Sequence, residues 1–184
     1  MYLTTTRPNL MLVVSLISRF MANSTELHFA TAKRIMRYLK GTLEFGIWYQ
    51  REGKSELLGY TDSNYAGDVD DNRSTLGYVF LMSGGAVAWS SRKQPIVTLS
   101  TIEVEYVAGA TCVCQAIWMK RILKEIGHEQ DEEMILFYEN TSTIKLSKNT
   151  VMHRKSKHIR VRYHFLRELT KEGVIKLVYC STKE

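Results

Sequence analysis

The stretch Leu57-Leu58-Gly59-Tyr60-Thr61-Asp62 decides the fold, because it is a short apolar run that ends in an acid. Its length and its bounded, mostly apolar character predict a β-strand. Asp62 is followed by Ser63 and Asn64, a composition that also suits a turn. The residues alone therefore leave two interpretations of Asp62 open, a turn former or a ligand at the end of a central strand.

The sequence downstream of this strand alternates between the periods of strands and helices. Ser83-Gly84-Gly85 separates two strand-like runs and predicts a hairpin. The expected elements are strands over 74–82 and 86–91, a helix over 100–126, a strand over 134–138, helices over 142–148 and 158–171, and a strand over 174–180. Strands and helices in this order predict an α/β domain.

The sequence upstream of the strand reads mainly as helical. Pro8 can open a helix that continues to about residue 21. Asn23, with Glu26 three residues later, resembles a capping box for a second helix, which Gly41 ends. A further strand is expected over 45–49.

Two other acids share features with Asp62. Glu139 follows the apolar strand over 134–138, and Glu105 lies in the first turns of the helix that begins near Ser100. Glu103 competes for the helix position, but with Ser100 it forms a capping box and so has a structural role. We expect Asp62, Glu105 and Glu139 to converge within about 8 Å, as a site for two Mg²⁺ ions about 4 Å apart requires.

The composition indicates one medium-sized domain or a domain with a helical appendage. The chain has 184 residues, of which 45% are hydrophobic, and a net charge of +6. From residue 141 onward 11 basic residues face 3 acidic ones, which suits either a polyanion partner or a solvated helix face. The three cysteines have no disulfide spacing, so we expect buried thiols in a reducing, intracellular compartment, with no secretion signal. The apolar run over 10–17 is too short to cross a membrane, which takes roughly 20 residues.

Further blocks lie along the chain in a fixed order. They are Thr5-Thr6-Arg7-Pro8, Arg37-Tyr38-Leu39-Lys40-Gly41-Thr42, Tyr60-Thr61-Asp62-Ser63, Arg73-Ser74-Thr75-Leu76-Gly77-Tyr78, Trp89-Ser90-Ser91-Arg92-Lys93-Gln94, Leu99-Ser100-Thr101-Ile102-Glu103-Val104-Glu105-Tyr106 and Lys157-His158-Ile159-Arg160-Val161-Arg162-Tyr163-His164-Phe165. With these blocks the chain resembles the ribonuclease H domain of Ty1/copia-type retrotransposon Pol polyproteins, preceded by the tail of the reverse transcriptase.

The resemblance implies a fold and a division of the chain. Residues 1–56 would be the helical C-terminal remnant of the reverse transcriptase. Residues 57–184 would form a ribonuclease H-like domain, a mixed five-stranded sheet with flanking helices whose last helix is missing. The implied function is that of a hydrolase, an endonuclease that cuts the RNA strand of RNA–DNA hybrids with Mg²⁺, or Mn²⁺ as the alternative ion.

The resemblance also assigns the catalytic and metal-binding roles to Asp62, Glu105 and Glu139. The family usually has Asp where this chain has Glu139, and the extra methylene moves the carboxylate by more than about 1 Å, a displacement that can cost on the order of 100-fold in rate. A fourth family acid lies beyond the last strand and is absent from this chain. We therefore expect weak or absent nuclease activity.

The segment around residue 155 is the expected nucleic-acid contact. By resemblance Arg154, Lys155, Lys157 and His158 form a basic element beside the site, although each histidine taken singly is better explained as an ordinary solvated or half-buried side chain. The implied partners are an RNA–DNA hybrid or other nucleic acid and the reverse transcriptase portion of the polyprotein, with no membrane. Two alternatives remain: a non-catalytic nucleic-acid-binding remnant, and an interaction module that docks through its helical appendage.

The tryptophans could stack on bases, but packing in the core is the simpler interpretation. Trp118 lies on the apolar face expected for the helix over 100–126. Trp89 stands beside polar residues on a hairpin strand, so the sequence does not decide which side of the sheet it faces.

Overall fold

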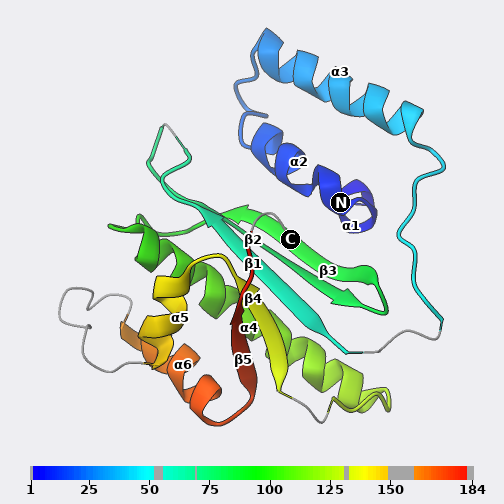
Figure 1. The fold of residues 1–184 in the computed structure, drawn as a ribbon. Helices are drawn as coiled ribbons and strands as arrows, with labels where there is room; N and C mark the ends of the chain where they lie inside the picture. The colour runs from blue at the N-terminus through cyan, green and yellow to red at the C-terminus, as the bar shows by residue number, and fades with distance from the viewer. Residues whose placement is uncertain (1, 52–55, 69, 131–132, 149–159, 182–184) are drawn as a thin grey trace.

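The computed structural model describes residues 2–51, 56–68, 70–130, 133–148 and 160–181 (Figure 1). The helical elements are α1 (Tyr2–Thr6), the 3₁₀ turn η1 (Pro8–Leu10), α2 (Met11–Ser18), α3 (Glu26–Gly41), α4 (Thr101–Glu125), α5 (Thr141–Lys148) and α6 (Arg160–Lys171). The strands are β1 (Leu58–Asn64), β2 (Thr75–Met82), β3 (Gly85–Lys93), β4 (Met134–Tyr138) and β5 (Ile175–Tyr179).

The five strands form one mixed sheet in the order β3-β2-β1-β4-β5. β1 pairs antiparallel with β2 and parallel with β4, and Thr61 lies opposite Tyr138 in the parallel pair. Since parallel strands run in the same direction, the residues that follow these two positions emerge at the same end of the sheet. The α/β fold class expected from the sequence is confirmed.

The core lies between the sheet and α4. Alternate residues of a strand point to opposite faces, and those that face α4 include Thr61, Phe80 and Tyr138, all buried. Gly109 in α4 has no room for a side chain, because a Cβ atom there would overlap the Tyr138 ring and hydroxyl. The helix therefore approaches the sheet closely on this side, which brings the first turns of α4 down onto the ends of β1 and β4.

The start of α4 has the cap that the sequence predicts, but the burial predicted for its second half is not observed. The backbone N–H of Glu103 donates to Ser100 Oγ at 3.2 Å, and Glu103 Oε2 accepts from the N–H of Leu99 at 2.7 Å, so the structural role expected for Glu103 is confirmed. Trp118, expected in the core, is 56% exposed. The expectation was wrong because the buried residues of α4 are concentrated in its first four turns and few follow Ala116.

The N-terminal region departs from the expected elements. The helix expected over 8–21 consists of η1 and α2, which ends at Ser18, and a separate short α1 precedes it. The N-cap of α3 is Thr25 and not Asn23: the Thr25 N–H donates to His28 Nδ1 at 3.1 Å, a capping arrangement with histidine in the place of glutamate.

The strand expected over 45–49 is absent. Phe45 and Trp48 are 63% and 82% exposed, so their apolar character does not reflect burial in a sheet. Instead, the segment runs past the turn between β2 and β3. The Tyr49 hydroxyl donates to the Ala86 carbonyl and the Gln50 N–H donates to the Ser83 carbonyl, both at 2.8 Å.

η1 and α2 lie against β3 on the face of the sheet opposite α4, and α3 packs on α2 (Figure 1). Trp89 points to this side, where its indole N–H donates to the Thr4 carbonyl at 2.7 Å. The sheet is thus a packing partner of these helices. The boundary after residue 56 between a polymerase remnant and a nuclease domain stays a prediction.

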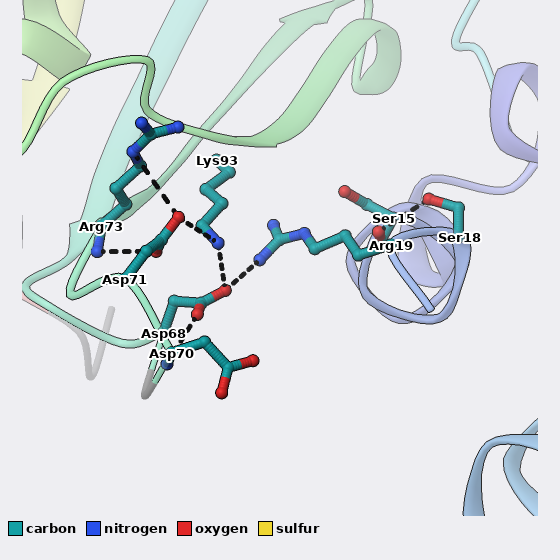
Figure 2. A network of polar contacts seen from close by, with 8 residues as sticks. All are labelled: Ser15, Ser18, Arg19, Asp68, Asp70, Asp71, Arg73 and Lys93. Atoms are coloured by element: carbon teal, nitrogen blue, oxygen red, sulfur yellow. Dashed lines mark hydrogen bonds and ion pairs between the residues drawn. The ribbon is translucent and has the colours of Figure 1, made fainter. Parts of the chain in front are cut away.

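A network of ion pairs connects the end of α2 to the loop after β1 (Figure 2). Arg19 Nη1 lies 3.2 Å from Asp68 Oδ2, and Lys93 Nζ pairs with Asp68 and, at 2.8 Å, with Asp71. The hydrogen bond from Lys93 lowers the pKa of Asp68 to about 2, although partial burial opposes this. None of the helices among the described residues combines the length and apolar composition needed to cross a membrane.

Candidate active site

Asp62 lies near the end of β1, on the face opposite α4. Its side chain is exposed, and its Oδ1 accepts a hydrogen bond from the N–H of Ser63 at 2.7 Å. The strand β1 continues for two residues after Asp62, to Asn64, before the chain turns. Asp62 is therefore a strand residue and not the turn former that the sequence also allowed.

Glu139 directly follows β4 at the same end of the sheet. Because Thr61 is paired with Tyr138, Asp62 and Glu139 are the next residues of adjacent parallel strands. Both acids line a cavity of about 300 Å³ between the sheet and the N-terminal helices. The two strand-end acids thus lie side by side, as their places in the sequence predict.

Glu105 reaches this end of the sheet from the second turn of α4. It is only 8% exposed. Its Oε1 accepts a hydrogen bond from the Ser63 hydroxyl at 2.9 Å, and its Oε2 is buried without a hydrogen-bond partner. One carboxylate oxygen is thus satisfied by the neighbouring strand and the other is unpaired.

The surroundings of Glu105 favour its protonated form. Burial raises the pKa of its carboxyl from 4.5 to about 7, the Ser63 hydrogen bond opposes this rise, and the negative charges of Asp62 and Glu139 add to it. A buried carboxyl near other carboxylates holds its proton because ionisation would place an uncompensated charge in a medium of low polarity. The influence of both other acids on Glu105 places all three in one electrostatic neighbourhood.

Oxygen ligands are the ones that Mg²⁺ and Mn²⁺ accept, and three carboxylates supply only oxygen. The unpaired Oε2 of Glu105 fits such a role, because a cation would satisfy it. However, within the described residues no three His, Cys, Asp or Glu side chains stand close enough together to hold one metal ion. The chemistry of the donor set fits a divalent cation, and the metal-binding role of the three acids stays a prediction.

The buried wall behind Glu105 is built from α4 and β4. The Tyr138 hydroxyl is buried without a hydrogen-bond partner, and burial raises its pKa well above 10. Cys112 is fully buried, which raises the pKa of its thiol to about 12, so it is inert at neutral pH. All three thiols are free, but Cys114 is exposed, contrary to the expectation of buried cysteines.

The residues expected to contact nucleic acid, Arg154, Lys155, Lys157 and His158, lie outside the described residues. A residue that the sequence interpretation missed is Ser63, which positions the Glu105 carboxylate. The signal was available: strand alternation sends the residue after Asp62 to the opposite face, where the helix that carries Glu105 packs.

Comparison with known proteins shows relatives over the whole chain, although no family model matches it. The retrovirus-related Pol polyprotein from transposon TNT 1-94 of Nicotiana tabacum is 41% identical over 181 residues, which are 97% of this chain and 13% of that protein. The one from transposon RE1 of Arabidopsis thaliana is 36% identical over the full chain and 12% of that protein. The chain therefore spans about an eighth of the length of these polyproteins.

A shorter relative is a secreted RxLR effector protein, number 161, of Plasmopara viticola. It is 42% identical over 120 residues, which are 65% of this chain and 84% of that protein. Sequences of this kind therefore occur outside long polyproteins as well.

Solved structures show the same fold at low sequence identity. The ribonuclease H1 LC11, isolated from compost, aligns with a TM-score of 0.53 and 15% identity over 70% of this chain and 86% of that one. The N-terminal ribonuclease H domain of a Mycobacterium tuberculosis protein aligns with a TM-score of 0.51 and 10% identity over 71% and 86% of the two chains. The sheet and its helices therefore have the ribonuclease H fold.

Proposed function

This chain belongs to the retrovirus-related Pol polyproteins of copia-type transposons, and from this premise we propose that its ribonuclease H-type module hydrolyses the RNA strand of RNA–DNA hybrids. The implied catalytic and metal-binding residues are Asp62, Glu105 and Glu139. The reverse transcriptase portion of the parent polyprotein would be the partner, and the hybrid that it synthesises would be the substrate.

The observation that carries the proposal is the state of the Glu105 carboxyl group. It is buried, has one unpaired oxygen and lies near two other acids, so that its pKa is about 7. A structural acid would be paired, as Glu103 is with the N–H of Leu99. An arrangement that leaves negative charge unbalanced suits a site whose stabilising partner is a cation.

Asp62, Glu105 and Glu139 would hold Mg²⁺ or Mn²⁺ through carboxylate oxygens. A bound divalent cation supplies activation of the attacking water and stabilisation of the leaving oxygen in phosphodiester hydrolysis. In the chain without a cation, burial keeps a proton on Glu105, and the negative charges of Asp62 and Glu139 add to this effect. A bound cation would balance the charge of the ionised carboxylates and so favour the loss of this proton.

The chain's own groups prepare the carboxylates for this role. The Ser63 hydroxyl fixes one oxygen of Glu105, which leaves the other available. The parallel pairing of β1 and β4 fixes the relative placement of Asp62 and Glu139. Because Glu105 must lose its proton before it can serve as a ligand, we expect cleavage to increase as the pH rises through about 7.

We propose that the activity is slow. Glu139 carries its carboxylate one methylene further from β4 than an aspartate would, and misplacement by about 1 Å can cost on the order of 100-fold in rate. A hybrid would be recognised by its shape, its phosphates and the 2′-hydroxyl groups, with little sequence preference.

Cleavage of a hybrid labelled at the 5′ end of its RNA strand, with 5 mM Mg²⁺ or Mn²⁺ in separate reactions, tests the proposal. We expect turnover well below about 1 s⁻¹, cuts in the RNA strand alone, and loss of the cuts in Asp62→Asn. Asp70→Asn is the matched control, because Asp70 is an exposed acid in the loop after β1.

The outcomes separate the proposal from the two alternatives. Binding of the hybrid at low salt without cleavage in either metal would favour a non-catalytic nucleic-acid-binding remnant. Absence of both binding and cleavage would favour an interaction module. Cleavage that survives in Asp62→Asn would point to a contaminating nuclease and would remove the assignment.

A further inference from the structure

A second groove lies on the α4 side of the sheet, away from the three acids. It has a volume of about 520 Å³ and is open to solvent between β3, α4 and α6. Arg92 of β3 and Arg162 of α6 both line it, together with the polar side chains of Thr111 and Gln115, and none of the described residues that line it is acidic. The groove is therefore positively charged.

Arg162 has an unusual position in this groove. It lies on the side of α6 that carries Phe165 and Leu166, one of which lines the groove while the other is fully buried in the core. Its Nη1 is buried and has no hydrogen-bond partner. An arginine cannot lose its charge in a protein, so a guanidinium nitrogen buried without a partner costs free energy.

The start of α6 adds to this cost. Arg162 stands in its first turn, which contains no acidic residue. The N–H groups at a helix N-terminus already carry partial positive charge, so basic side chains there are unfavourable and an anion is favourable.

Nothing in the described part of the chain neutralises the two arginines. The ion pairs found there involve Asp68, Asp71 and Glu129, and neither Arg92 nor Arg162 takes part. Two guanidinium groups that line one groove repel each other unless an anion lies between them. The planar guanidinium matches the oxygens of a phosphate group, often through two parallel hydrogen bonds.

We infer that this groove binds a phosphate group of a polynucleotide backbone, held by Arg162 and Arg92. The groove is large enough for a phosphate together with its sugar, and Tyr78 and Phe165 offer an apolar wall for the latter. The site would fix the position of a duplex at a distance from the three acids. The inference rests on the proposed function only in taking a polynucleotide as the source of the phosphate.

The first test measures the stability of the full-length chain without divalent cations. Arg162→Met keeps the aliphatic length and removes the charge, so in phosphate-free buffer we expect a higher Tm than for the wild type. Inorganic phosphate, against chloride at equal ionic strength, should raise the Tm of the wild type and leave that of Arg162→Met unchanged. A lower Tm for Arg162→Met with the phosphate effect intact would show that Arg162 has a packing role and would overturn the inference.

The second test measures the salt dependence of hybrid binding by fluorescence anisotropy in EDTA. Loss of one phosphate contact lowers the slope of log affinity against log salt by about 1, which we expect for Arg162→Met and for Arg92→Gln. Arg162→Lys keeps the charge and should retain the slope, and Arg121→Gln, an exposed arginine of α4 outside the groove, is the control.

The two tests together identify the source of the phosphate. Loss of the phosphate effect on Tm with an unchanged salt slope would assign the groove to a free phosphate group and overturn the backbone assignment. Because neither test uses divalent cations, they succeed or fail independently of the cleavage assay, which reports on Asp62, Glu105 and Glu139.

Discussion

Replacing Glu105 by Gln should change how the stability of the chain depends on pH. The folded carboxyl has a pKa of about 7 against an ordinary value of 4.5, so between these values the folded state holds a proton that the unfolded state has lost. Stability therefore falls as the pH rises from about 4.5 to about 7 and is level above that. Gln cannot ionise and should remove this fall.

The size of the effect follows from the difference between the two pKa values. That difference corresponds to about 3 kcal/mol at full strength, and solvent screening at the partly open strand ends reduces it, so we expect about 1–3 kcal/mol. At pH 5, where Glu105 is largely protonated, wild type and variant should differ little. At pH 8 in EDTA, Glu105→Gln should be the more stable protein by that amount.

Urea unfolding followed by circular dichroism at pH 5, 6, 7 and 8 measures the effect. Subtracting the free energy of unfolding of one protein from that of the other at each pH cancels the contributions of the histidines and of other titratable groups that both proteins share. Glu44→Gln, at an exposed position, is the control and should follow the wild type. Parallel profiles for wild type and Glu105→Gln, within about 0.5 kcal/mol, would refute the reasoning that Glu105 is a buried, unbalanced acid.

Three further predictions concern packing, the N-terminal helices and the basic segment. Gly109→Ala should lower the free energy of unfolding by about 1–3 kcal/mol in urea, because the new Cβ overlaps Tyr138, whereas Gly41→Ala, where nothing lies within 4 Å, should not; equal stabilities would contradict the tight packing. Asp68→Asn removes the partner of Arg19 and one of the two partners of Lys93, and it should speed tryptic cleavage within residues 1–51 relative to Asp70→Asn. Equal rates would show that the network does not hold these helices. Replacing Arg154, Lys155 and Lys157 together by Ala should lower the salt slope of hybrid binding by about 2–3, and an unchanged slope would mean that this charge is only solvated.

Much of the sheet could be predicted because its signals are local. The strand over 134–138 has the bounds expected from its apolar run, and Ser100 caps α4 where its sequence places it. The prediction of a strand over 45–49 was wrong because Phe45 and Trp48 are exposed, and exposed apolar residues cannot be told from buried ones in the sequence. The prediction that Trp118 packs in the core was wrong for a related reason, since helical periodicity does not show where a helix runs past the sheet it covers.

Some features of the candidate site could also be predicted from the sequence, and others could not. The common location of Asp62 and Glu139 follows from two apolar runs in the sequence that are each followed by an acid, and the choice of Glu105 over Glu103 follows from the capping role of Glu103. The unpaired oxygen of Glu105 and the unpaired nitrogen of Arg162 could not be predicted. Both depend on which side chains tertiary packing brings near, and neither has a local sequence pattern.

The central claim is that Asp62, Glu105 and Glu139 act as one site for a divalent cation. Electron paramagnetic resonance of free Mn²⁺, titrated into the protein at pH 8, tests it most directly, without nucleic acid and without turnover. We predict binding by the wild type that weakens as the pH falls below about 7, and a loss of affinity on the order of tenfold or more in Asp62→Asn and Glu105→Gln. Equal Mn²⁺ binding by the wild type and both variants would contradict the claim.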